Sequence, residues 1–142
     1  MIDLVQLVKT NNLLDLEQYL TLINVNTIDG WGDSLLHLAI RSGNINIIKL
    51  LMKFNPKLDI VNTSHESILE TLYDIKNKKI IKLLIPYFNM ELSIYDLTYM
   101  HKLTKICTFE LSATFITNNI DNIISYGYSD MIPENIKSIF LF

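Results

Sequence analysis

The chain has 142 residues, of which 49% are hydrophobic and 19% charged, and its formal net charge is −3. This composition excludes a disordered polar chain, and the acidic balance argues against a nucleic-acid binder, which usually presents a basic face. Glycine and proline occur only 4 and 3 times, which favours helices with short connections over a many-stranded sandwich.

The sequence also indicates a compartment. Its single cysteine, Cys107, cannot form an intrachain disulfide, which is typical of a reducing environment. The first residues lack the basic and apolar pattern of a secretory signal, and the apolar runs are too short to span a bilayer. We therefore expect a cytoplasmic protein without membrane contact.

Apolar residues at helical spacing predict pairs of short helices from the N-terminus onward. The first pair is expected at residues 4–9 and 13–22, with a turn at Asn11 and Asn12. In the next pair, Gly43 can close the first helix because glycine readily adopts a left-handed conformation. Helices this short are unstable alone, so the pairs are expected to stack against one another.

The chain matches itself when it is shifted by 33 residues. The segment at 47–51 recurs letter for letter at 80–84, and Asn44 falls on Asn77 in the same register. A fixed period that includes polar positions indicates a stack of repeated units rather than a single bundle.

One of these units resembles the ankyrin repeat. The matching residues are Asp29, Gly32, Ser34, Leu36, His37, Leu38, Ala39, Gly43, Asn44, Ile47, Ile48, Leu50, Leu51 and Met52. The resemblance implies an all-α ankyrin-repeat solenoid of about four to five helix-turn-helix repeats with degenerate terminal repeats. It also implies that His37 is structural and holds the turn through hydrogen bonds to backbone groups.

The resemblance extends to a single domain over residues 1–142. We place its repeats at roughly 1–23, 24–56, 57–89, 90–110 and 111–128, followed by a closing helix at 133–142. In the third repeat, His65 replaces a motif glycine and Lys76 replaces the turn glycine, so that turn must close without glycine.

Past residue 89 the pattern becomes degenerate. The internal spacing falls from 33 to 26, which predicts a hairpin shortened by about seven residues. Cys107 and Phe109 are then expected on the buried face of a helix. Asn118 and Asn119 are expected to form a turn before a helix at 120–126, which Gly127 caps.

No group of residues predicts catalysis, a metal site or a cofactor. Cys107 and His101 could act as nucleophile and base, but a core cysteine more often serves as a small hydrophobe. Glu66 and Glu70 lie four apart on one helix side and could bind a metal, although a solvated edge is the more common role. We expect neither an enzyme nor a small-molecule substrate.

Four lysines cluster in the third repeat: Lys76, Lys78, Lys79 and Lys82. Such a cluster can bind nucleic acid when aromatic residues are interleaved with it, and none are found here. We therefore interpret these lysines as a solvated turn and outer helix face, and we expect no nucleic-acid partner.

In the ankyrin family, the hairpin tips and the exposed edge of the first helices bind proteins. Carried over to this chain, the candidate contacts are Trp31, Asp33, Arg41, Ser42, Thr63, Ser64, Glu66, Asp74, Ile75, Met100 and His101. Trp31 is the only tryptophan and lies in a turn, and exposed tryptophan is enriched among interface hot spots. The alternative is that Trp31 folds back on the neighbouring repeat.

The leading hypothesis is a binder that inhibits or sequesters another protein. Asp33, Glu66 and Asp74 would make the candidate surface acidic, which suits a basic partner. In size and architecture the chain resembles bacterial immunity proteins that neutralise a toxin domain in a 1:1 complex. The alternative is a bacterial or viral ankyrin effector that binds host proteins.

Overall fold

The computed structural model describes residues 3–141 of the chain. It divides into two compact units, Met1–Ile75 (unit 1) and Lys76–Phe142 (unit 2), which are described separately. In chain order the helices are α1 (Leu4–Lys9), α2 (Leu13–Leu20), α3 (Leu35–Ser42), α4 (Ile45–Met52), α5 (Ile68–Ile75), α6 (Lys78–Leu84), η1 (Ile85–Tyr87), α7 (Ile94–Ile106), α8 (Ala113–Ser125), η2 (Ser129–Met131) and α9 (Glu134–Leu141).

Short polar side chains set where most helices begin. At seven N-termini a side-chain oxygen accepts a hydrogen bond from a backbone N–H of the first turn, which would otherwise lack a partner. The capping residues are Asp3, Asn12, Ser34, Asn44, Asn77, Ser93 and Ser112. The predicted helix at 4–9 is confirmed, and the one predicted at 13–22 ends at Leu20.

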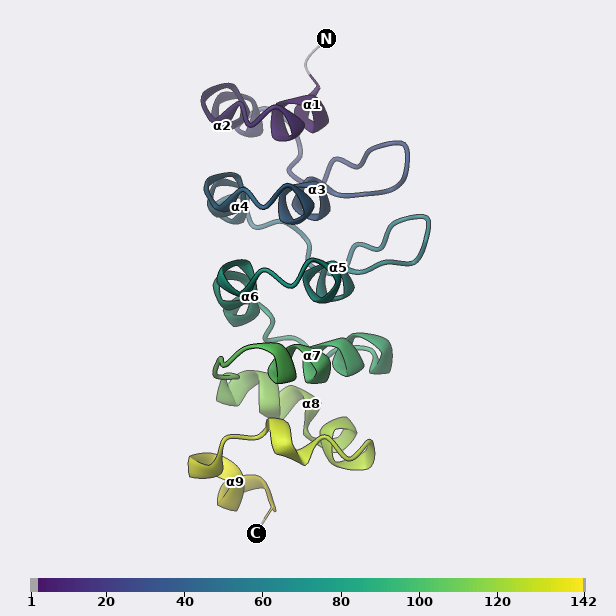
Figure 1. Cartoon of the computed structure of the whole chain (residues 1–142), viewed down its shortest axis with the longest axis vertical. Coiled ribbons are helices and arrows are strands. Elements are labelled where there is room, and N and C mark those ends of the chain that lie inside the picture. The colour runs from purple at the N-terminus through teal and green to yellow at the C-terminus, as the bar shows by residue number, and fades with distance from the viewer. Residues whose placement is uncertain (1–2, 142) are drawn as a thin grey trace. The chain divides into compact units, whose positions relative to one another are not determined.

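In unit 1 the helices stack in two rows. Helix α1 packs on α3, α3 packs on α5, and α2 packs on α4, as Figure 1 shows. Their apolar stripes meet in a core that includes Leu16, Leu36, Ile40, Ile47 and Leu51, each at most 1% exposed. Burying one such side chain is worth about 1.5–3 kcal/mol, so stacking provides the stability that each short helix lacks.

Left-handed residues shape the turns, with or without glycine. Gly43 has φ +73° and closes α3, and Gly32 has φ +79° in the loop before it. One period later, His65 and Lys76 have φ +61° and +57°. The prediction that the third repeat turns without glycine is confirmed, and the backbone keeps the same conformation.

In unit 2 two expectations from the sequence are wrong. Helix α7 runs to Ile106 and is followed by extended backbone, so Cys107 and Phe109 do not lie on a helix. Helix α8 continues through Asn118 and Asn119 without a turn.

The continuity of α8 has a physical cause. The side chain of Asn119 is buried, its Oδ1 accepts a hydrogen bond from the Leu92 N–H (2.8 Å), and its Nδ2 donates to the Met90 carbonyl (3.0 Å). Through these bonds the Asn119 side chain holds the segment before α7, and the residue does not form a turn. Gly127, with φ +74°, follows α8 as expected, and α9 lies where the closing helix was expected.

Candidate functional site

Two loops of unit 1, the first hairpin (residues 28–34) and the second hairpin (residues 61–67), carry several predicted contact residues and project on the same side (Figure 1). In the first hairpin, Oδ1 of Asp29 accepts hydrogen bonds from the N–H groups of Trp31 and Asp33, both 2.9 Å. In the second, Oδ1 of Asn62 accepts two bonds from the N–H groups two and four residues later, both also 2.9 Å. The repeat therefore extends to the tips, where an acceptor side chain fixes each turn.

The two hairpins are hydrogen-bonded to each other. The Trp31 carbonyl accepts bonds from the backbone N–H of Thr63 (2.9 Å) and from its hydroxyl (2.8 Å). A Cβ added at Gly32 would lie 3.0 Å from the Thr63 nitrogen, so only glycine allows this close approach. The Trp31 side chain is 74% exposed, and the alternative that it folds back on the neighbouring repeat is wrong.

Beneath the tips, Arg41 joins two acidic residues. Its guanidinium donates to Asp33 at 2.5 Å and to Glu66 at 3.0 Å. Asp33 also accepts from the Asn62 side chain at 2.9 Å, and Glu66 accepts from the Thr71 hydroxyl at 2.6 Å. Three predicted contact residues are therefore brought together, and they bind one another.

The ionisation of this group follows from its contacts. Burial alone would raise the pKa of Asp33, but hydrogen bonds from Arg41 and Asn62 and the charge of Arg41 outweigh it, so the pKa is lowered. Burial alone would lower the pKa of Arg41, and its bonds to Asp33 and Glu66 instead raise it. Both groups are charged at neutral pH and hold each other in that state.

His37 is structural, as the resemblance implied. Its Nδ1 accepts a hydrogen bond from the Ser34 N–H (3.1 Å), so Nε2 carries the proton and donates to the Glu66 carbonyl (3.0 Å). The side chain is fully buried, and burial lowers its pKa. The neutral ring thus links the start of α3 to the second hairpin.

The predicted contact residues differ in exposure. Those with exposed positions are Trp31, Arg41, Ser42, Thr63, Ser64, Asp74 and Ile75, whereas Glu66 and His101 are half-buried. Asp33 and Met100 are 6% and 0% exposed, so including them was wrong. Asp33 is turned inward by Arg41 and Asn62, and Met100 packs in the core of unit 2. Met100 and His101 belong to unit 2 and are considered apart from the hairpins.

Two members of the polar network were missed by the sequence reasoning. Asn62 could have been found, because the 33-residue shift places it on Asp29. Thr71 gave no signal, since its bond to Glu66 depends on how α5 follows the second hairpin. The periodicity of apolar residues predicts which residues of a helix are buried, but it does not predict the hydrogen bonds that side chains form across a turn.

Three acidic residues form a row along α5. Glu70 and Asp74 lie on the helix, and Glu66 lies two residues before its start. One carboxylate oxygen of each lies within 4.8 Å of the others. The Arg41 guanidinium lies 3.0 Å from Glu66 and occupies part of that carboxylate's bonding capacity. The arrangement favours an acidic edge stabilised by Arg41 over a metal site.

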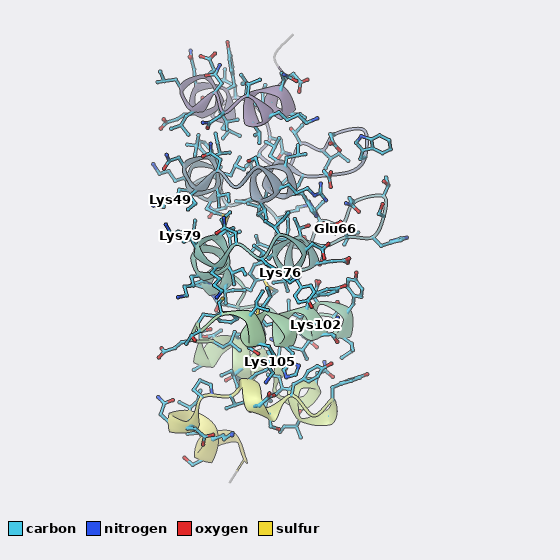
Figure 2. All side chains as sticks on the ribbon, viewed as in Figure 1. Lys49, Glu66, Lys76, Lys79, Lys102 and Lys105 are labelled. Carbon is cyan, nitrogen blue, oxygen red and sulfur yellow. The ribbon has the colours of Figure 1, made fainter. Side chains whose placement is uncertain are left out.

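Acidic charge in unit 1 is concentrated on the hairpin side. Residues 29–41 and 62–75 carry five carboxylates and one guanidinium, whereas the rest of the unit carries four carboxylates and four lysines. Figure 2 shows Glu66 on the hairpin side of unit 1 and Lys49 on the opposite side, on α4. The net charge of this unit therefore comes from the face that bears Trp31.

Cys107 and His101 do not form a nucleophile and base. Cys107 is half-buried after the end of α7, and burial raises the pKa of its thiol despite the opposing effect of Lys82 and Lys78. His101 is instead hydrogen-bonded through Nε2 to Asp130 at 2.9 Å. A thiol with a raised pKa has little thiolate at neutral pH, which disfavours nucleophilic chemistry.

Comparison with protein families decides the classification. The model for ankyrin repeats, in 3 copies, matches residues 4–96. The chain belongs to the ankyrin-repeat family. Ankyrin repeats are a protein–protein interaction module, and the match ends within α7.

Other comparisons add less about this ankyrin protein. A search of curated proteins finds no match. Within residues 3–141, no helix is long and apolar enough to cross a membrane.

Proposed function

We propose that this ankyrin protein binds a partner protein through the hairpin side of unit 1 and thereby inhibits or sequesters it. The binding face consists of Trp31, Thr63, Ser64, Asp74 and Ile75, with Arg41, Ser42 and Glu66 along its inner edge. The observation that carries the proposal is Trp31, whose side chain is 74% exposed on a turn tied by backbone hydrogen bonds on both sides. An exposed aromatic side chain on a rigid tip binds with little loss of conformational entropy.

The charge of this face supports a basic partner. The hairpin side that bears it, residues 29–41 and 62–75, has five carboxylates and one guanidinium, an excess that attracts a positively charged surface and accelerates association at low salt. Because this chain resembles bacterial immunity proteins in size and architecture, we propose a 1:1 complex with a basic toxin domain inside the cytoplasm. The protein acts by occupying its partner's surface and requires no cofactor or small-molecule substrate.

The proposal is tested with the secreted toxin domain encoded next to this gene. Mixing the purified proteins is expected to give a stable 1:1 complex in which toxin activity is lost. The double variant W31A/D74K, at two exposed positions, is expected to weaken the complex by about a hundredfold or more. L22A, at a 79% exposed leucine after α2, is the matched control and should leave affinity unchanged.

Three results would contradict the proposal. The first is a failure of the two proteins to bind, and the second is binding that W31A/D74K does not affect. The third is equal weakening by L22A, which would point to a face other than the hairpins. A complex with a host protein instead of a toxin would keep the binding face but favour the effector alternative.

A further inference from the structure

We propose that unit 2 carries a second protein-docking surface, which binds an acidic segment of a partner. This tyrosine surface consists of Tyr95, Tyr99, His101, Lys102, Tyr126 and Tyr128, drawn from α7 and the segment that follows α8. It stands independently of the function proposed for unit 1. Three of its four tyrosines lie beyond residue 96, where the ankyrin match ends.

One row of this surface runs along α7. Tyr95 and Tyr99 are four residues apart, and their rings make an edge-to-face contact with centroids 5.1 Å apart. The amino group of Lys102 lies 4.9 Å from the centre of the Tyr99 ring. Residues spaced by three and four positions share one helix face, so these side chains form a continuous strip.

A second row lies beside the first. Tyr128 stacks on His101 with ring centroids 4.2 Å apart, and its hydroxyl is 3.1 Å from the hydroxyl of Thr98. Tyr126 lies next to Tyr128, with centroids 6.4 Å apart. Since Thr98 lies three residues after Tyr95 on α7, the two rows occupy neighbouring stripes of the helix surface.

Side-chain hydrogen bonds hold the second row in place. Asp130, on η2, is bonded to both His101 and Lys105 of α7. The hydrogen bond from Lys105 lowers the pKa of Asp130, so the carboxylate stays charged at neutral pH. The segment bearing Tyr126 and Tyr128 is thus fixed on α7 before any partner arrives, which reduces the entropy cost of docking.

Two of the four tyrosines are exposed despite these contacts, and Tyr99 and Tyr128 are half-buried. Tyr95 is 47% exposed and Tyr126 is 52% exposed. Tyrosine is enriched at protein interfaces because its ring offers a large contact area, its hydroxyl can bond, and only two torsions must be fixed. Four such side chains gathered from two segments are suited to packing against another protein.

Charge indicates what the partner carries. Lys102 and Lys105 both project from α7 (Figure 2), and His101 of the same helix stacks on Tyr128. Among the side chains that form or support this surface there are two lysines and one carboxylate, Asp130, so cationic groups are in excess. An acidic segment with apolar side chains complements this surface, pairing with the lysines while it packs on the rings.

A single-stranded nucleic acid fits less well. The Tyr95–Tyr99 and Tyr126–Tyr128 pairs are inclined at 64° and 31°, so their faces do not form one parallel platform for successive bases.

The test uses three labelled probes in fluorescence-anisotropy titrations with the full chain. The first is a peptide built from repeated Asp-Glu-Phe triplets, the second replaces its acidic residues with lysine, and the third is oligo(dT) of similar length. We expect saturable binding of the acidic probe alone. The variant Y95A/Y126A should weaken that binding by about tenfold or more, and Y95F/Y126F should retain most of it.

Tyr87 provides a matched control because it is also 47% exposed but lies on η1, outside the tyrosine surface. Y87A should leave binding unchanged, and thermal unfolding of each variant checks that the fold is intact. The inference is overturned if the acidic probe does not bind, if either other probe binds as tightly, or if Y87A weakens binding as much as Y95A/Y126A. Because unit 1 is unaltered in these variants, the outcome is separate from that of the toxin-binding test.

Discussion

Arg41 organises the hairpin side of unit 1 at the scale of single residues. Its guanidinium bridges Asp33, whose side chain is only 8% exposed, and Glu66, whose backbone carbonyl accepts from His37. One side chain therefore links α3, the first hairpin and the second hairpin. Arg41 therefore supports the proposed binding face from below.

Replacing Arg41 with alanine should destabilise unit 1. The change leaves the Asp33 carboxylate buried with only Asn62 as a side-chain donor, and removing one partner of a fully buried pair costs about 3–5 kcal/mol. Because Arg41 is one-third exposed, we expect a loss of about 2 kcal/mol in unfolding free energy. Urea unfolding followed by circular dichroism measures it. K53A, at an exposed lysine on the opposite row, is the control, and an equal loss there would contradict this role.

His37 should make stability depend on pH. Its pKa is lowered in the folded state by burial, so the unfolded chain binds the proton more readily. The stabilisation is complete above the ordinary histidine pKa of about 6.5 and is lost as pH falls toward the lowered value. The pKa of Asp33 is also lowered, but its effect falls below about pH 4.

The measurement compares the wild type with H37Q between about pH 7.5 and pH 5. The wild type should lose more unfolding free energy over this interval than H37Q, which has no titrating group at the position. H37Q should also be less stable at the higher pH, because glutamine does not reproduce both bonds of the buried ring. Equal pH dependence in the two proteins would show that the ring is not held neutral.

At the scale of elements, the hairpins show what a repeat preserves when its motif residues change. The backbone at His65 has the same left-handed conformation as at Gly32, although a side chain is disfavoured there. At Gly32 the Thr63 nitrogen also lies too close to leave room for a Cβ, so both the backbone conformation and the available space require glycine. His65 is exposed, and only its backbone conformation is constrained.

Replacing His65 with glycine should therefore stabilise unit 1. The left-handed conformation costs an ordinary residue about 1–2 kcal/mol, and the greater entropy of glycine in the unfolded chain offsets part of the gain. We expect a net increase of about 0.5–1 kcal/mol in unfolding free energy. H65A removes the same side chain but retains the Cβ, so it should give no increase. Similar gains from both variants would assign the effect to the histidine side chain rather than to the backbone.

The elements also show how far the sequence could predict this structure. The 33-residue period was sufficient for the helix pairs of unit 1, because their apolar stripes, caps and turns are local. It failed at Asn119, which looks like a turn residue but bonds the buried backbone of a segment 27 residues away. The prediction from sequence failed in the same way at Asp33. Its acidic side chain suggested a surface contact, but it is turned inward by Arg41, which lies eight residues later on α3.

For the whole molecule, the main asymmetry is electrostatic. Unit 1 carries nearly twice as many carboxylates as cationic side chains, and unit 2 is nearly balanced. Within unit 1 the excess lies on the hairpin side, because the four carboxylates and four lysines outside residues 29–41 and 62–75 balance one another, with Lys49 of α4 on the opposite side. The long-range field of unit 1 should therefore favour cationic ligands at one face, independent of which protein is the natural partner.

A peptide of about six lysines can detect this field in the absence of a known partner. In an NMR titration at low salt, amide signals of residues 29–33 and 62–75 should shift more than those of α2 and α4. The shifts should be lost at about 0.5 M salt, where the Debye screening length falls to a few ångströms. D74K should reduce them because it reverses one exposed charge, whereas K49E on the opposite side should not. Equal shifts on both sides of unit 1 would mean that the acidic excess is not focused on the hairpins, and the case for a basic partner would lose its electrostatic support.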